Sequence, residues 1–179
     1  MKIFAVYAQP ILIEKPEWFD DFYRSYGGGY DLHITLKQSC SIDEQDERDI
    51  KNILADLFHS LPTHNRKIDV ILDTLVIPEE GCIMVTSQKN PLLYELQKKI
   101  VEALKGYTQY TEPELEAYEK NFIPHITIAE DVSRVKENLD ILKSDCFFRA
   151  AIRDITGIFV KEQTLEEALN QKNKAIYPL

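Results

Sequence analysis

The sequence contains two four-residue stretches of the same pattern, HITL at residues 33–36 and HITI at residues 125–128. Each reads histidine, apolar residue, threonine, apolar residue. Because alternate side chains of a β-strand point to opposite faces, the histidine and threonine share one face and the two apolar residues point the other way. Two such strands brought together would form a small polar cradle that holds two imidazole rings and two hydroxyls. The pattern therefore predicts a functional site built on two strands.

The segments around the two stretches repeat the same order of predicted elements. In the first half the residue pattern predicts a strand over 2–8 ended by Pro10, a helix over 16–26, the motif strand over 30–37, a helix over 43–61 and a strand over 67–77. In the second half it predicts a strand over 82–87, a helix over 91–104, a short helical segment over 111–118, the motif strand over 122–129, a helix over 133–142, an extended region over 147–161 with room for a strand pair, and an edge strand over 175–179. We expect a single bilobal domain over residues 1–179, with lobes of approximately 1–80 and 81–179 between which strands can be exchanged.

Composition limits the classes of partner. The net charge of −9 argues against a tight grip on duplex DNA, because such binding needs many Lys and Arg contacts to phosphate. No run of 18 or more apolar residues is present, so we expect no membrane span. The three cysteines show no metal-binding spacing, which is typical of reduced thiols in a cytoplasmic protein. We expect a cytoplasmic monomer that acts on small nucleotides or single-stranded RNA ends.

Paired His-x-Thr-x motifs on strands, in the two halves of a chain of this length, resemble the two-histidine phosphoesterase superfamily. This superfamily includes bacterial RNA 2′,3′-cyclic phosphodiesterases (also called 2′-5′ RNA ligases), plant cyclic phosphodiesterases and RNA-trimming enzymes of spliceosomal RNA maturation. The resemblance implies an α+β fold in which a duplicated β-α-β-α-β unit forms two pseudo-symmetric antiparallel sheet lobes, with outer helices and a central groove. It also implies that His33 and His125 are catalytic, that Thr35 and Thr127 bind the substrate phosphate, and that neither a metal nor another cofactor takes part.

The chemistry of a cyclic phosphate explains why such a site needs two histidines. Opening a 2′,3′-cyclic phosphate requires a base that takes a proton from water and an acid that gives one to the departing ribose oxygen. An imidazole with a pKa near about 6.5 can do either at neutral pH, and threonine hydroxyls can donate to the non-bridging oxygens. Similarity to the family assigns His125 as the base and His33 as the acid, although the residues themselves do not order the two roles. We therefore expect a metal-independent phosphodiesterase that hydrolyses 2′,3′-cyclic or 2′-linked phosphodiesters.

Strand alternation adds candidates beside the first motif. Asp31 and Lys37 would share the face of His33 and Thr35, so Asp31 is expected to orient the imidazole and Lys37 to supply positive charge near phosphate. Tyr30 is a further candidate for substrate binding, by stacking on a nucleobase. The alternative for Asp31 and Lys37 is that they are solvated residues at the ends of the strand.

Three other readings stay open. The same acid–base pair permits reversible 2′-5′ RNA ligation, and a catalytically silent nucleotide- or RNA-binding module would keep the same cradle. His33, His125 and Asp31 could also serve as metal ligands, although hydrolytic zinc sites usually show a His-x-x-x-His or Glu-bearing helix that this sequence lacks. The remaining histidines, His59 and His64, are not assigned to catalysis.

Overall fold

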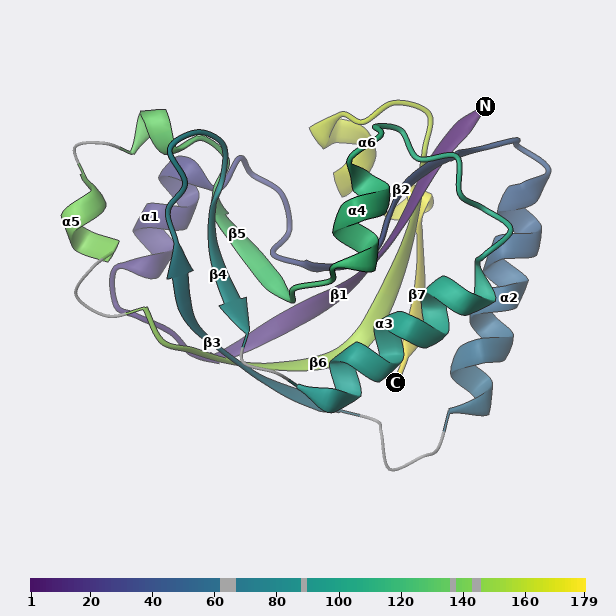
Figure 1. Ribbon diagram of the computed structural model, residues 1–179, viewed down its shortest axis with the longest axis horizontal. Helices are drawn as coiled ribbons and strands as arrows, with labels where there is room; N and C mark the ends of the chain where they lie inside the picture. Colours follow the sequence, from purple (N-terminus) through teal and green to yellow (C-terminus); the bar gives the residue numbers. More distant parts are fainter. Residues whose placement is uncertain (62–66, 88–89, 136–137, 143–145) are drawn as a thin grey trace.

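The computed structural model describes residues 1–61, 67–87, 90–135, 138–142 and 146–179, which form a seven-stranded antiparallel sheet with helices around it (Figure 1). The strands are β1 (Lys2–Glu14), β2 (Ile34–Ile42), β3 (Ile68–Val76), β4 (Ile83–Ser87), β5 (His125–Ala129), β6 (Phe148–Val160) and β7 (Lys174–Pro178). The α-helices are α1 (Phe19–Tyr26), α2 (Asp46–Ser60), α3 (Pro91–Ala103), α4 (Leu115–Lys120), α5 (Leu139–Leu142) and α6 (Leu165–Leu169), and two 3-10 turns are η2 (Val132–Arg134) and η4 (Gln171–Asn173). The predicted α+β class with an antiparallel sheet and outer helices is confirmed.

The sheet is continuous across the two predicted lobes. Its strand order is β2-β1-β6-β3-β4-β5, and β7 also pairs with β6. The two long strands β1 and β6 pair with each other along nearly their whole length, while β6 pairs with β3 through residues 148–152 and with β7 through residues 154–158. Strands from both halves of the sequence are therefore interleaved. The division into lobes near residue 80 stays a prediction.

The two motif strands form the two ends of this strand order, and the sheet curls until they meet. β2 contacts β5 although four strands lie between them in the sheet, and α1 also packs against β5. The backbone N–H of Glu130, directly after β5, donates to the carbonyl of Tyr26 at 3.0 Å. This closure brings motifs that are far apart in the sequence to one side of the molecule (Figure 1).

Several predicted elements need correction. β1 continues past Pro10 to Glu14, because its pairing with β2 ends at Ala8 and a residue without an N–H is tolerated where one side of the strand is unpaired. The region over 147–161 contains a single strand, β6, where a strand pair was allowed for. Helix α6 was not predicted, and the predicted helix over 133–142 falls partly outside the described residues.

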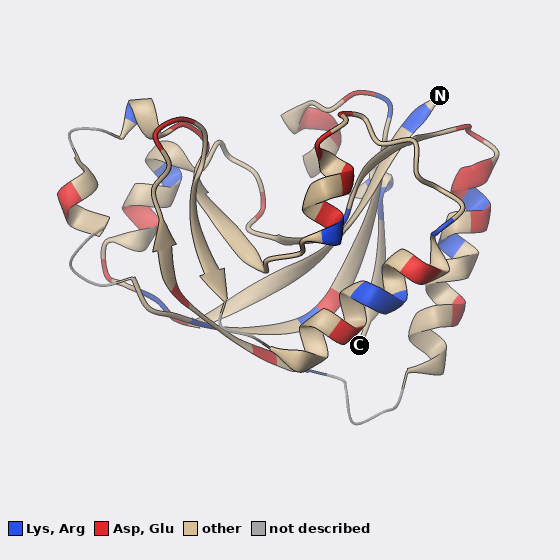
Figure 2. Cartoon of the chain, viewed as in Figure 1, with Lys and Arg blue, Asp and Glu red and all other residues tan. Residues whose placement is uncertain are grey.

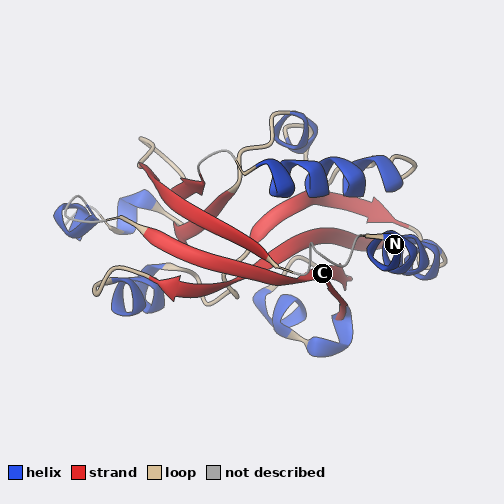
Figure 3. Cartoon of the chain, turned by 90° about the horizontal axis from the view of Figure 1, so that it is seen from below, coloured by secondary structure: helices blue, strands red, loops and turns tan. Residues whose placement is uncertain are grey.

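Helices cover the sheet with the apolar faces that the periodicity predicts. In α2, Ile50, Leu54 and Phe58 are buried, and the Phe58 ring stacks on Tyr177 of β7 with the ring centroids 5.4 Å apart. Seen from below, the strands occupy the middle of the molecule with helices on either side (Figure 3). Within the described ranges, no helix combines the length and the apolar character needed to cross a bilayer.

Candidate active site

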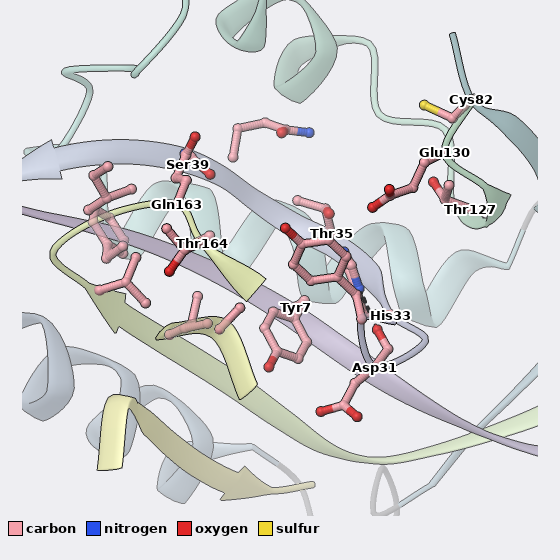
Figure 4. A pocket seen from close by; sticks show the side chains of 18 of the residues that line it. Tyr7, Asp31, His33, Thr35, Ser39, Cys82, Thr127, Glu130, Gln163 and Thr164 are labelled. Carbon is pink, nitrogen blue, oxygen red and sulfur yellow. Dashed lines mark hydrogen bonds between the residues drawn. The ribbon is translucent and has the colours of Figure 1, made fainter. Parts of the chain in front are cut away.

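A cavity of about 580 Å³ is lined by residues of both motifs (Figure 4). His33 and Thr35 come from the first motif, and Thr127 comes from the second. Tyr30, the candidate for stacking on a nucleobase, also lines the cavity, and its role in binding stays a prediction. His125 is not among the lining residues, but it is close enough for its charge to lower the pKa of His33. The structure thus brings the four motif residues together around one site.

The two histidines are held in the same way. Nδ1 of His33 lies 2.8 Å from the carbonyl oxygen of Asp31, and Nδ1 of His125 lies 2.8 Å from the carbonyl oxygen of Ile123. A carbonyl only accepts hydrogen bonds, so Nδ1 carries the proton in both rings. Nε2 is then the nitrogen of each imidazole left to exchange a proton with a substrate.

His33 sits in an environment that disfavours its charged form. Burial lowers the pKa of His33 below its usual value of 6.5, and the charge of His125 lowers it further. The hydrogen bond to the Asp31 carbonyl and the negative charge of Asp31 act in the opposite direction. The balance of these effects lowers the pKa of His33, so the neutral imidazole is favoured in the free protein.

The predicted role of Asp31 needs correction in one respect. Asp31 does orient the imidazole of His33, but through its backbone carbonyl, whereas its carboxylate accepts from Nζ of Lys174 at 2.8 Å. The reason is that residues 31–33 precede β2, in a stretch without regular secondary structure, so side-chain alternation does not determine where the carboxylate points.

The prediction that Lys37 faces the substrate is wrong. Its side chain is 1% exposed, and Nζ lies 3.0 Å from the carboxylate of Glu119 in α4. The pairing of β1 with β2 shifts by one residue here, from Val6 opposite Lys37 to Tyr7 opposite Thr35. Such a β-bulge inserts an extra residue and breaks strict alternation, so Lys37 leaves the face that Thr35 occupies.

Sequence reasoning missed several residues that line the cavity. Tyr7 of β1 packs its ring on His33, with centroids 5.2 Å apart and the planes tilted by 49°. Glu130, which directly follows β5, lies beside Thr127 in Figure 4, and Gln163 lies toward the other end of the cavity. The position of Glu130 next to the motif was a signal that could have been used. Tyr7 and Gln163 carry no local signal in the sequence.

The charge of the cavity wall is unexpected for a phosphate site. Asp31 and Glu130 line the cavity, and no Lys or Arg of the described residues does. Burial and the negative charges of Asp31 and Glu130 raise the pKa of Tyr23 to about 12, so its hydroxyl stays protonated and donates to the carbonyl of Tyr30 at 2.8 Å. Lysines and arginines are scattered over the helices and the sheet (Figure 2). This wall favours a ligand of low negative charge.

The glycine run before the first motif forms part of the wall. Gly27 lines the cavity, and Gly28 has φ +70°. The positive φ of Gly28 favours glycine, and a Cβ atom there would lie 2.0 Å from the carboxylate of Glu130, so a larger residue would also require that side chain to move.

The remaining candidates lie elsewhere. His59 is in the last turn of α2 and does not line the cavity, and His64 lies outside the described residues. In the part of the chain that is described, no three His, Cys, Asp or Glu side chains are grouped so as to hold a metal ion.

Comparisons with known proteins identify the family and the fold of the chain. The sequence model of the 2′-5′ RNA ligase superfamily matches residues 14–144. No curated protein matches the sequence. Among solved structures, similar folds are a phosphoesterase (12% identity, TM-score 0.55, 100% of this chain and 96% of that chain covered), Usb1 of Kluyveromyces marxianus (10%, 0.55, 99% and 98%) and E. coli LigT complexed with 3′-AMP (13%, 0.53, 99% and 95%). The chain therefore belongs to the 2′-5′ RNA ligase superfamily, the group of two-histidine phosphoesterases that its paired motifs resemble.

Proposed function

We propose that the protein is a metal-independent phosphodiesterase that hydrolyses 2′,3′-cyclic or 2′-linked phosphodiesters of small nucleotides or RNA ends. The observation that carries the proposal is the meeting of both His-Thr motifs at one cavity, with Nδ1 of each histidine bonded to a backbone carbonyl. The similar E. coli LigT structure holds 3′-AMP, a nucleotide with its phosphate on a ribose oxygen.

In the proposed reaction, His125 removes a proton from water as the oxygen attacks phosphorus. The bond from phosphorus to one ribose oxygen breaks, and protonated His33 gives its proton to that oxygen. Thr35 and Thr127 donate hydrogen bonds to the non-bridging oxygens, where negative charge develops. Each proton transfer is worth roughly 10²–10⁴-fold in rate.

The environment of His33 suits the acid role once the substrate is bound. Burial lowers the pKa of His33, so the neutral ring is favoured in the empty site. The negative charge of a phosphodiester favours the imidazolium. Bound substrate therefore favours protonation of His33. Because burial lowers the pKa of His33, the protonated ring is a stronger acid toward the leaving oxygen than an exposed imidazolium would be.

The test is hydrolysis of the four nucleoside 2′,3′-cyclic phosphates in EDTA, between about pH 5 and pH 9 where histidines titrate. The wild type should give a bell-shaped profile, and His33→Ala and His125→Ala should each lose at least about 10²-fold in kcat/KM. His59→Ala, which changes a histidine outside the cavity, is the matched control and should be unaffected. Full activity in either motif variant, or activity abolished by EDTA and restored by a metal, would contradict the proposed mechanism.

Reversible 2′-5′ RNA ligation is a second candidate, favoured by the superfamily whose sequence model matches the chain. The two histidines would exchange their roles in the reverse direction. Incubating an oligonucleotide that ends in a 2′,3′-cyclic phosphate with one that has a free 5′-hydroxyl would detect the ligated product. Tight nucleotide binding without turnover of either kind of substrate would instead identify a binding module.

A further inference from the structure

Three residues are linked to His33 directly or through one another, and we call Tyr7, Asp31 and Lys174 the His33 clamp. Nζ of Lys174 lies 2.8 Å from Oδ2 of Asp31, and its positive charge also acts on the hydroxyl of Tyr7, whose pKa it lowers against the effect of burial. Tyr7 packs its ring on His33, and Asp31 holds Nδ1 of His33 through its carbonyl. The four residues are thus connected by contacts from Lys174 to Asp31, from Asp31 to His33 and from His33 to Tyr7 (Figure 4 shows all of them except Lys174).

Lys174 is a buried cation, and its burial has to be compensated. Its side chain is 6% exposed, at the first residue of β7. Removing an ammonium group from water is unfavourable unless it is paired and hydrogen-bonded. Asp31 and Tyr7 supply that compensation, and the ion pair joins residues 143 positions apart in the sequence. The ammonium is therefore confined beside the first motif.

The His33 clamp lies at a part of the chain where no strand hydrogen bonds fix the position of His33. Residues 31–33 lie before the first residue of β2 and outside any helix or strand. Asp31 binds in two directions, with its carboxylate on Lys174 and its carbonyl on Nδ1 of His33. Fixing the carboxylate fixes the carbonyl that determines the tautomer of His33. His125 is bonded in the same way to Ile123, a residue without a carboxylate, so this device belongs to one histidine.

We propose that Lys174 and Asp31 are positioning residues that hold His33 in the Nδ1–H tautomer and orient its Nε2 toward the substrate. The sequence predicted that Lys37 supplies a cation near the first motif. In the structure Lys174 supplies it, through its pair with Asp31. Both Lys174 and Tyr7 lie outside residues 14–144, the stretch that the superfamily model matches. The last strand of the chain thereby becomes part of the site. The catalytic consequence rests on the proposed function, but the positioning itself does not.

The test in the free protein is NMR titration of the His33 ring, which reports both its pKa and its tautomer. The charged groups that act on the ring are Asp31 and His125, Tyr7 packs against it, and Lys174 acts through Asp31. In Lys174→Met the carboxylate of Asp31 loses its counter-ion, so the pKa of His33 should rise by about 0.5–1 unit, as a Coulomb interaction at an effective dielectric of about 20 gives. The population of the Nδ1–H tautomer should also fall. Lys174→Arg should restore both, and exposed Lys172→Met should change neither.

A second variant keeps the test decisive if Lys174→Met does not fold. Asp31→Asn keeps the backbone carbonyl and changes a side chain that is 42% exposed. It removes the charge that raises the pKa of His33, so that pKa should fall while the tautomer becomes mixed. An unchanged pKa and tautomer of His33 in the folded variants would overturn the proposal.

Activity gives an independent reading. With a 2′,3′-cyclic nucleotide, Lys174→Met should lower kcat about tenfold with little change in KM, because a misoriented acid affects proton transfer more than binding. A rise in KM alone would contradict positioning and assign Lys174 to substrate binding. If the wild type hydrolyses no cyclic nucleotide, the proposed function is wrong. The NMR titration then still tests whether Lys174 and Asp31 position His33.

Discussion

Lys37 and Glu119, which are 82 residues apart in the sequence, form a buried ion pair beneath the first motif strand. Their side chains are 1% and 4% exposed, and Nζ lies 3.0 Å from Oε2. The same carboxylate accepts from the backbone N–H of Gln38 at 3.0 Å and from the hydroxyl of Tyr110 at 2.8 Å. These bonds attach α4 to β2 at the bulge, two residues beyond Thr35. The pair therefore fixes the strand that carries the site without touching the substrate.

Removing one partner of this pair should be costly. Lys37→Met leaves the Glu119 carboxylate buried without its counter-ion, so the free energy of unfolding should fall by about 3–5 kcal/mol. Urea denaturation measures this change. The double variant Lys37→Met/Glu119→Gln should recover much of the loss, because no uncompensated charge remains. Lys120→Met, which breaks the exposed pair with Glu116, is the control and should cost less than about 1 kcal/mol. A loss below about 1 kcal/mol for Lys37→Met would show that the pair does not hold the strand.

An anion in the cavity should raise the pKa of His33. Burial keeps that pKa below 6.5 in the free protein, and a nearby negative charge stabilises the imidazolium. By linkage, an anion that binds the protonated form better must bind more tightly as the pH falls through the pKa of His33. NMR titration with sulfate, which does not titrate in this range, compared with chloride at equal ionic strength, measures the shift. The same shift in exposed His59 would mean that general ionic effects cause it.

The lowered pKa of His33 should also make the free energy of unfolding depend on pH. An unfolded histidine has a pKa near about 6.5, whereas the folded value is lower. As the pH falls below about 6.5, the unfolded chain therefore binds a proton that the folded chain does not, and the free energy of unfolding decreases. His33→Asn should show a smaller decrease between about pH 7.5 and about pH 5.5 in urea denaturation. Equal slopes in the two proteins would refute a lowered pKa for His33.

A comparison of alanine variants at Gly28 and Gly29 can distinguish the cost of backbone strain from the cost of steric contact. Both have positive φ (+70° and +82°), but a Cβ on Gly28 would meet Glu130 at 2.0 Å, whereas one on Gly29 would meet only Leu165, at 3.3 Å. Either alanine variant should lose about 1–2 kcal/mol from the backbone conformation. Gly28→Ala should lose more, and in a Glu130→Ala background that excess should disappear. Equal losses in the wild-type background would mean that the Glu130 side chain moves aside freely.

The carboxylate of Glu130 should weaken binding of anions. It lines the cavity together with Thr127, and no Lys or Arg of the described residues lines that cavity. Glu130→Gln should tighten binding of 3′-AMP about two- to tenfold, the size of a Coulomb interaction across several ångströms near the surface. Calorimetry measures the affinity, and Glu112→Gln, on an exposed residue outside the cavity, is the control. Weaker binding in Glu130→Gln would assign the carboxylate to recognition of a donor on the nucleotide.

The sequence by itself determined the class of the fold and the family of the chain. Local periodicity predicts α2 and α3 well, because an amphipathic helix is specified by residues three and four apart. The His-x-Thr spacing predicts which side chains share a face wherever the strand is regular, and Thr35 and Thr127 both line the cavity. These are properties of neighbouring residues, and neighbouring residues are what a sequence displays directly.

Only the tertiary structure decided which charges surround the motif histidines. The bulge in β2 depends on pairing with β1, and it moved Lys37 from the predicted face into a pair with Glu119. The cation near the first motif is instead Lys174, which pairs with the carboxylate of Asp31, a residue 143 positions away in the sequence. Long-range electrostatic contacts depend on how the sheet closes and on what is excluded from water, and no local pattern encodes either. The motif residues that meet at the cavity were therefore predictable from the sequence, and the charges around them were not.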